Sequence, residues 1–275
     1  MLERTRFSVW TTFVGFSLLL PAACRSGHEG ADPFHQLADP EPGVRVEAVK
    51  RLAQSDDPRA QSALMRALAD PEFDVQRSAA GILGRRDDDA LIEQLITGLK
   101  SDELQRRSGC VLALAQSADP RVFDALAEQC RRGNLAFRWQ VAEAIGRARN
   151  RSMIPRMLTS VHKGDDWQVQ EVAVLALAEM HEAVGIEPLL QALKSNNNYI
   201  RKIACWKLSL IGDPQALEPL IDDVLKKYDT YETRIWGALA INSITKEASG
   251  VGASLMAREP EKFLQWWKQN RHRYE

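Results

Sequence analysis

The chain has 275 residues, and its 36 basic and 37 acidic side chains leave a formal net charge of −1 at pH 7. This balance excludes a strongly basic nucleic-acid-binding protein, because such proteins concentrate Lys and Arg to neutralise phosphates. A length of this order favours two ordinary domains, but the regular period that begins near residue 44 favours one continuous array.

Residues 1–24 have the layout of an export signal. Arg4 and Arg6 precede an apolar stretch over 7–20, and small residues then lead to Cys24. A basic start, an apolar core and small residues at the end are typical of a secretory signal peptide. The small residues directly before Cys24 also resemble a bacterial lipoprotein signal, with Pro21 where such signals usually have Leu. That resemblance implies cleavage before Cys24 and attachment of lipid to it.

Three outcomes for this segment stay open. Cleavage could leave a lipid-anchored chain or a released one, and an uncleaved segment could act as an anchor, since the apolar run only just reaches spanning length. Our hypothesis is an exported protein in the periplasm or cell envelope, held at the membrane through lipid on Cys24. Residues 25–32 lack periodicity and are predicted to be a short tether.

Residues 33–245 are predicted to form a solenoid, because one pattern recurs seven times. It consists of an apolar anchor, Arg, two variable residues, two small residues, two variable residues, a large aliphatic residue and a small residue. The steps between anchors are 31, 31, 31, 32, 31 and 33 residues. The anchors are Val44, Val75, Arg106, Phe137, Val169, Ile200 and Thr233. A period this regular is the signature of a repeat protein.

The spacing of the columns predicts that each copy is a helix. The anchor, fourth and eighth positions share one helical stripe, so large residues enter the core while small ones let neighbouring helices approach. The large column is Leu52, Leu83, Leu114, Ile145, Leu177, Leu208 and Ile241. The small columns are Ala48, Ala79, Cys110, Val141, Ala173, Ala204 and Gly237, and then Ala53, Gly84, Ala115, Gly146, Ala178, Ser209 and Asn242.

A second periodic run follows each of these helices and predicts its partner. Its main column is Leu64, Leu95, Leu126, Met157, Leu189 and Leu220. The turns between the two helices carry Asp57-Pro58, Asp119-Pro120 and Asp213-Pro214, in which Asp can cap the second helix and Pro suits its first turn. The prediction is an all-α solenoid of about seven helix pairs.

Both ends depart from the pattern and are predicted to be caps. Residues 33–38 align with the end of a second helix whose first helix is missing, which is what an N-terminal half-repeat cap looks like. Residues 246–275 follow a Gly-rich turn and end in a run in which Phe263, Leu264 and Trp267 share one face. We expect that run to close the open end of the core.

The repeat resembles the HEAT repeats, in particular the bacterial phycobilisome-lyase-like HEAT type. The matching residues are Asp70-Pro71 with Val75, Ala79, Leu83 and Gly84, and Asp165 with Val169, Ala173, Leu177 and Ala178. The resemblance covers residues 32–245 and implies the fold. Members of that family range from enzyme subunits to binding scaffolds, so it does not imply one function.

Polar and thiol columns have structural interpretations. Cys110, Cys130 and Cys205 stand in apolar columns and are predicted to be buried. Arginines recur beside the anchors, with Gln76 and Gln170 filling gaps, and the HEAT resemblance implies that they bridge to acidic turns of the neighbouring unit, such as those at Asp70 and Asp165. The arginines of this column are Arg45, Arg107, Arg138, Arg201 and Arg234.

No enzyme signature is present in the sequence. The His-Glu pairs at His28 and His181 do not recur at the period, and no zinc-type ligand cluster or glycine-rich phosphate loop occurs. We therefore expect no catalytic residue, no metal and no cofactor. The alternative is an accessory subunit or enzyme of the bilin-lyase-like HEAT group.

The predicted function is a protein-binding scaffold that does not bind nucleic acid. HEAT solenoids curve so that their second helices line the concave surface, which wraps extended partners. The candidate partner-binding residues on those helices are Glu93, Asp124, Glu187 and Glu218. Trp139 and Trp206, on outward columns of the first helices, are the competing candidates.

Overall fold

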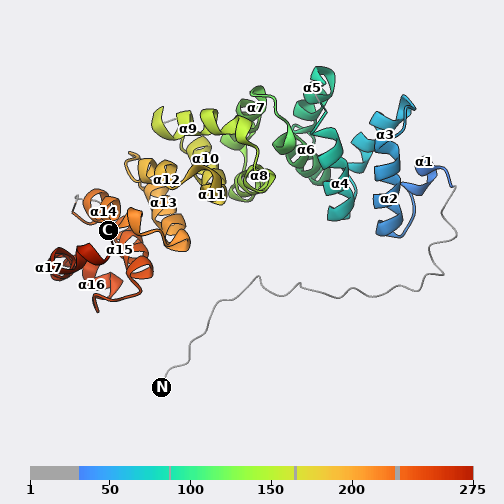
Figure 1. The fold of residues 1–275 in the computed structure, drawn as a ribbon. Helices are drawn as coiled ribbons and strands as arrows, with labels where there is room; N and C mark the ends of the chain where they lie inside the picture. Colours follow the sequence, from blue (N-terminus) through green and yellow to red (C-terminus); the bar gives the residue numbers. More distant parts are fainter. Residues whose placement is uncertain (1–30, 87, 164–165, 227–229, 275) are drawn as a thin grey trace, which may run out of the picture.

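The computed structural model describes residues 31–86, 88–163, 166–226 and 230–274, and in these the chain is an α-solenoid without β-strands (Figure 1). The predicted export signal with Cys24 lies outside the described residues, as does Asp165. The predicted fold class is confirmed.

Six of the seven first helices are each followed by a shorter second helix. The first helices are α2 (Pro42–Ala53), α4 (Phe73–Leu83), α6 (Leu104–Gln116), α8 (Leu135–Ala148), α10 (Trp167–Glu179), α13 (Asn198–Ile211) and α15 (Tyr231–Thr245). The second helices are α3 (Arg59–Ala67), α5 (Asp89–Gly98), α7 (Arg121–Arg132), α9 (Ile154–Lys163), α12 (Glu187–Ala192) and α14 (Leu217–Leu220), which a π-turn over Ile221–Leu225 extends.

The Asp-Pro turns start the second helices as their chemistry predicts. The Asp57 carboxylate accepts a hydrogen bond from the Arg59 backbone N–H at 2.8 Å, and Asp119 accepts one from the Arg121 N–H at 2.7 Å. These bonds satisfy backbone donors that the first turn of a helix leaves without a partner.

Short helices close the two ends of the array. At the N-terminal end α1 (Pro33–Gln36) packs on α2, and Asp32 caps it by accepting a hydrogen bond from the Phe34 N–H. At the other end α15 packs on α16 (Ala253–Arg258), and α17 (Glu261–Asn270) follows. Phe263 of α17 is fully buried, so this helix covers the end of the core.

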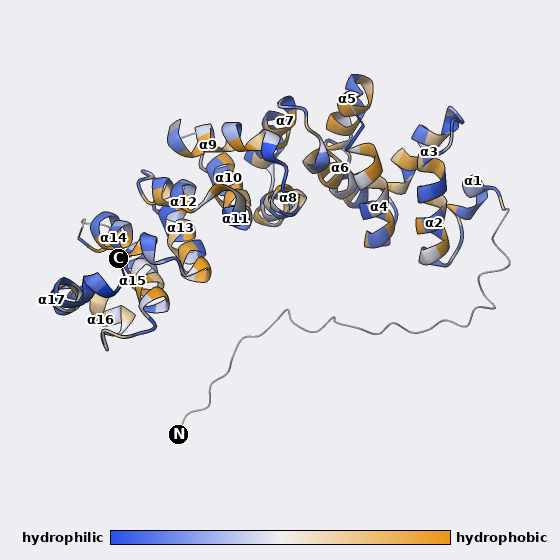
Figure 2. Ribbon diagram, viewed as in Figure 1, coloured by the Kyte–Doolittle hydropathy of each residue, from blue (hydrophilic) through white to orange (hydrophobic). Residues whose placement is uncertain are grey.

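The predicted core columns are buried. Every residue of the large aliphatic column has a relative exposure of 0% or 1%, and so has every residue of the main column of the second helices. In Figure 2 the helices carry apolar and polar residues together, as amphipathic helices packed in two layers do. The columns join into one apolar core that runs through the whole array.

Small residues bring successive first helices close together. A Cβ atom on Gly84, at the end of α4, would clash with the Ala113 carbonyl oxygen of α6, and one on Gly146 of α8 would clash with the Glu179 side chain of α10. Contacts between successive first helices are correspondingly extensive, whereas successive second helices touch sparsely. The first-helix layer is therefore the more tightly spaced of the two.

The array consequently bends toward its first helices. In Figure 1 it forms an arch with α3, α5, α7 and α9 along the outer edge and α2, α4, α8 and α13 along the inner edge. The expectation that the second helices line the concave surface is therefore wrong. The layer with the closer helix spacing must lie on the inside of a curved array.

The described part of the chain contains no helix that is long and apolar enough to cross a membrane.

The three core cysteines are buried, as predicted. Burial raises the pKa of Cys110 to about 11 and that of Cys130 to about 12, which keeps both thiols protonated at neutral pH. We expect a thiol reagent to label none of the three in native Cys24→Ser protein and all three after denaturation. A Ser62→Cys variant, exposed on α3, is the positive control and should react at once. Rapid labelling of the native thiols would contradict the core assignment.

Candidate functional site

Exposed apolar residues gather on the first helices. Leu255 of α16 is the one exception among the large hydrophobic side chains that are exposed in the described residues. The others are Phe73, Leu104, Leu135, Trp139, Trp167, Leu210, Tyr231, Trp236 and Leu239. Their restriction to the first helices makes that layer the candidate interaction surface.

Part of this set forms a row along the array. The first residue of a first helix is a large apolar side chain in five repeats, and these side chains are between 39% and 57% exposed. The row consists of Phe73, Leu104, Leu135, Trp167 and Tyr231. In the sequence, each of these five residues stands two positions before the anchor of its repeat. They lie outside the inward-facing columns, so the periodicity of the core does not predict them.

A cluster of four aromatic residues joins three repeats, and we name it the aromatic cluster: Trp139, Trp167, Tyr199 and Trp206. The rings of Trp139 on α8 and Trp206 on α13 stack with centroids 5.7 Å apart, although α10 lies between these helices in the array. Trp167 and Tyr199 meet edge to face at 5.9 Å. The stacking across α10 is possible because the first-helix layer lies on the inside of the bend.

The carboxylate of Glu171 holds the aromatic cluster together. Glu171 lies on α10 and is fully buried. It accepts hydrogen bonds from Arg138 Nε at 2.5 Å, from Trp139 Nε1 at 3.1 Å and from the Tyr199 hydroxyl at 2.8 Å. A buried charge is tolerated when it is paired and its oxygens are fully hydrogen-bonded, as these are.

Two cations complete the aromatic cluster. The Arg138 guanidinium stacks 4.8 Å from the centroid of the Trp167 ring, and Lys207 Nζ lies 4.7 Å from that of Trp206. Lys207 is also paired with Glu179 of α10 at 2.7 Å. Trp139 and Trp167 nevertheless keep 42% and 39% of their surface exposed, so the fixed rings are available to another molecule.

Tyr199 provides a pH-dependent test of this arrangement. Burial, together with the hydrogen bond to the Glu171 carboxylate, raises its pKa to about 12. Because the folded pKa exceeds the value of about 10 for an unfolded chain, the contribution of Tyr199 to stability is complete below pH ~10 and is lost as the pH rises through 12. We expect the free energy of unfolding to fall more steeply between these values in the native sequence than in Tyr199→Phe. Phenolate absorbance should show one tyrosine titrating late, and titration of every tyrosine near pH 10 would contradict this.

Four members of the arginine column make structural contacts: Arg45, Arg107, Arg138 and Arg201. Arg45 makes a two-pronged ion pair with Asp70 of the next repeat, with both N–O distances at 2.8 Å, and also donates to the Asp39 carbonyl. Gln76 donates to the Asp70 carbonyl at 2.7 Å. The predicted bridge to an acidic turn is thus present at Arg45, where it ties two inter-repeat turns together.

Other members of this column make further structural contacts. Arg107 and Arg201 donate to the carbonyls of Ser101 and Ser195, at the start of their own repeats. Arg138 pairs with a carboxylate inside a helix, Glu171, which the sequence reasoning missed. The signal in the sequence was an acidic residue beside the apolar run that fills most of helix α10.

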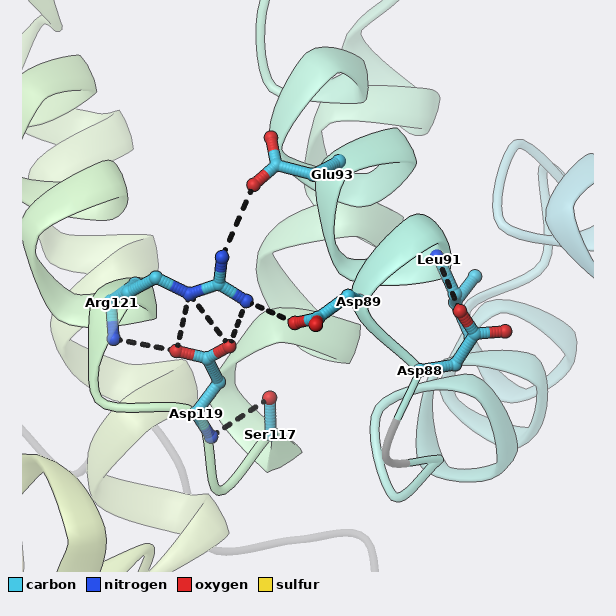
Figure 3. A network of polar contacts seen from close by, with 7 residues as sticks. All are labelled: Asp88, Asp89, Leu91, Glu93, Ser117, Asp119 and Arg121. Carbon is cyan, nitrogen blue, oxygen red and sulfur yellow. Dashed lines mark hydrogen bonds and ion pairs between the residues drawn. The ribbon is translucent and has the colours of Figure 1, made fainter.

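Two of the predicted partner-binding acids form ion pairs between second helices. Arg121 of α7 contacts Asp89 at 2.5 Å and Glu93 at 3.6 Å, both on α5, and binds Asp119 of its own turn (Figure 3). The Arg121 hydrogen bond holds the pKa of Asp119 below its usual range. These pairs connect neighbouring second helices where their packing is sparse.

Asp124 repeats this arrangement one unit later, since its carboxylate pairs with Arg156 of α9 at 2.7 Å. Glu187 and Glu218 are exposed at the start of α12 and α14. The structure therefore spreads the four predicted residues along the outer edge of the arch and does not bring them together at one site. Their role in binding a partner stays a prediction.

Among the described residues, no group of three or more His, Cys, Asp or Glu side chains is arranged to hold a metal ion.

These features define the class of protein: an α-solenoid built of helix pairs, with an aromatic cluster that hydrogen bonds hold in position on its inner side. The HEAT-repeat family matches residues 31–115 and 92–178. The chain therefore belongs to the HEAT-repeat proteins.

The solved structures that match this chain share little sequence with it. The complex of CpcE and CpcF of phycocyanin lyase from Nostoc sp. matches at 19% identity over 82% of this chain and 91% of that chain, with a TM-score of 0.33. An engineered protein matches at 20% identity over 78% and 97%, with a TM-score of 0.29. No curated protein matches the chain significantly.

Proposed function

We propose that the chain is a non-catalytic protein-binding scaffold whose partner contacts the first helices, on the inner side of the arch. The observation that carries this proposal is the concentration of exposed apolar side chains on those helices. HEAT repeats in general build extended binding surfaces of this kind.

The types of these exposed side chains, and the hydrogen bonds that fix some of them, favour a protein partner. Trp and Tyr contribute disproportionately to protein interfaces, because they bury a large area with few rotatable bonds. The hydrogen bonds of Glu171 hold Trp139 and Tyr199 before any partner arrives. Binding then loses little side-chain entropy, which raises the affinity that a given contact area can provide.

The repeating row supports a partner that extends over several units. Leu104, Leu135 and Trp167 begin three successive first helices and are exposed in the same way. Neighbouring helices in such arrays lie about 8–10 Å apart. A partner segment in extended or helical form can therefore place apolar side chains against consecutive repeats.

Site-specific photo-crosslinking tests the proposal. A benzophenone amino acid replaces Leu135, on the first helix α8, or Glu218, which is exposed on the second helix α14. We expect a protein adduct in the source cells from the Leu135 position and none from the Glu218 position. Adducts from Glu218 alone would overturn the placement, and adducts from neither position would overturn the proposed function.

The acidic residues of the second helices are the competing contact surface. Asp124→Lys and Glu187→Lys reverse two exposed charges, and exposed ion pairs contribute only about 0–1 kcal/mol to stability. If the partner binds the first helices, these variants should capture it as the native sequence does. Loss of capture, with an unchanged melting curve, would instead support Glu93, Asp124, Glu187 and Glu218 as the contact.

We also propose that the chain is exported and anchored by lipid on Cys24. The support is the sequence of residues 1–24 alone, with its basic start, apolar core and small residues before the cysteine. Intact-mass analysis of the membrane fraction should find a chain that begins at Cys24 and carries acyl groups, whereas Cys24→Ser should lack lipid. An unmodified chain that still begins at Met1 would contradict the proposal.

A further inference from the structure

A cleft on the outer edge of the arch is lined by more basic than acidic side chains. It has a volume of about 800 Å³ and lies between the second helices α3 and α5, next to the start of α6. The cleft exists because the array bends toward its first helices, which spreads the second helices apart. Its lining includes Arg66, Lys100 and Arg106, against one acid, Glu93.

None of the three cations has an acidic partner among the described residues. Ion pairs between side chains are frequent elsewhere on this surface: Arg121 pairs with Asp89, and Arg156 pairs with Asp124. Arg66, Lys100 and Arg106 take part in none of them and are exposed to the cleft. Glu93 is in turn partly neutralised by Arg121 at 3.6 Å. The cleft is therefore a positively charged concavity with free hydrogen-bond donors.

Arg106 occupies a position that other repeats use for the core. Val75, Val169 and Ile200 stand at the same place in their repeats and are buried, with exposures of 0% to 1%. In the third repeat the anchor position instead carries a guanidinium group that reaches the cleft. Replacing an apolar anchor by a charged one gives up apolar burial, so the third repeat differs from the others in a way that core packing does not explain.

We propose that this cleft binds an acidic segment of a protein partner, through carboxylates that pair with Arg66, Lys100 and Arg106. Guanidinium groups bind carboxylates in a planar, two-pronged geometry, and such charge-assisted bonds are stronger than neutral ones. The inference rests on the proposed scaffold function for the nature of the ligand, but it concerns the opposite layer of the array.

The size of the cleft favours a peptide over a small anion. Pockets of about 300–1,000 Å³ take ligands of drug size, and the cations come from α3, from the turn after α5 and from α6. Met65 and Thr97 add an apolar group and a hydroxyl to the lining. A chain with several carboxylates can reach all three cations, whereas one phosphate fills only part of the space.

Fluorescence anisotropy with a labelled hexaglutamate peptide tests the site directly, with hexalysine and inorganic tripolyphosphate as the comparison ligands. We expect hexaglutamate to bind in low salt, its affinity to fall as salt screens the charges, and hexalysine not to bind. Arg106→Val, which installs the residue type of the other anchors, should weaken hexaglutamate binding by about fivefold to tenfold. Arg66→Gln and Lys100→Gln should have effects of the same size.

Matched controls separate the cleft from overall charge and from folding. Arg147→Gln removes a cation from α8, far from the cleft, and should leave the affinity within about twofold, since exposed charges at a distance are screened. Arg66 and Lys100 are exposed, so their variants report on binding even if Arg106→Val alters packing. Equal weakening by Arg147→Gln, or no weakening by the three cleft variants, would overturn the proposal.

Two further outcomes test the nature of the ligand and the link to the scaffold function. Tripolyphosphate that binds the native cleft more tightly than hexaglutamate would identify a small-anion site and overturn the peptide proposal. This assay is independent of the crosslinking at Leu135. If hexaglutamate does not bind but Leu135 forms adducts, the cleft proposal is overturned and the scaffold function stands. If hexaglutamate binds but no adduct forms, the cleft proposal stands and the scaffold function is overturned.

Discussion

Leu114→Asp is expected to lower the free energy of unfolding by more than about 4 kcal/mol, the range reached when an unpaired polar or charged group enters a core. Leu114 lies on α6, in the middle of the array, and is fully buried. The described residues of the core around it are apolar, so a carboxylate at this position would have no basic partner among them. Urea denaturation followed by far-UV circular dichroism should show the loss.

A repeat array allows this damage to stay local. Each repeat contacts its neighbours, so the central repeats can unfold while both ends keep their helices. We therefore expect a transition that is both earlier and broader than that of the native chain. Leu104→Asp is the matched control, since it makes the same change on the same helix at a position that is 57% exposed. It should change stability by less than about 0.5 kcal/mol, and equal effects of the two variants would refute the assigned orientation of α6.

Glu171→Ala is expected to destabilise the fold by about 3–5 kcal/mol, because it removes one partner of a buried ion pair. The Arg138 side chain would keep its charge at 9% exposure and retain only the Gly133 carbonyl as an acceptor. Trp139 Nε1 and the Tyr199 hydroxyl would lose their acceptor as well. The melting temperature and the near-UV circular dichroism of the stacked tryptophans should both change.

An exposed ion pair within α8, the helix that carries Arg138, is the control for Glu171. Arg147 and Glu143 of α8 form an ion pair at 2.7 Å with side chains 71% and 55% exposed. Glu143→Ala should cost less than about 1 kcal/mol. The double variant Glu171→Leu with Arg138→Leu should recover part of the loss, since it leaves no unpaired buried charge. If Glu171→Ala destabilises the fold as little as Glu143→Ala does, Glu171 does not hold the aromatic cluster together.

The helices and the core could be predicted from the sequence because they depend on short-range periodicity. Leu83 and Leu114 recur one period apart with small residues at fixed distances, and helical geometry alone places them on one stripe. The same reasoning explains the Asp-Pro turns, where Asp57 accepts a hydrogen bond from a backbone N–H two residues away.

The candidate site could be predicted only in part. Trp139 and Trp206 stood out as outward-facing, but their stacking joins residues on α8 and α13 with α10 between them. Glu171 was not predicted as a site residue, because its three hydrogen-bond donors come from α8 and α13 and not from its own helix. The contribution of such residues depends on partners in other repeats, which periodicity within one repeat does not specify.

The sequence by itself determined the number of repeats, the residues that face the core and the capped ends. The tertiary structure decided which layer lies inside the bend, and with it the aromatic cluster on the inner side and the charged cleft on the outer side. The physical reason is that curvature is the accumulated result of small differences in helix spacing. Close approach at Gly84 and Gly146 tightens the first-helix layer, and the second helices then separate enough for Arg66, Lys100 and Arg106 to line an open cleft.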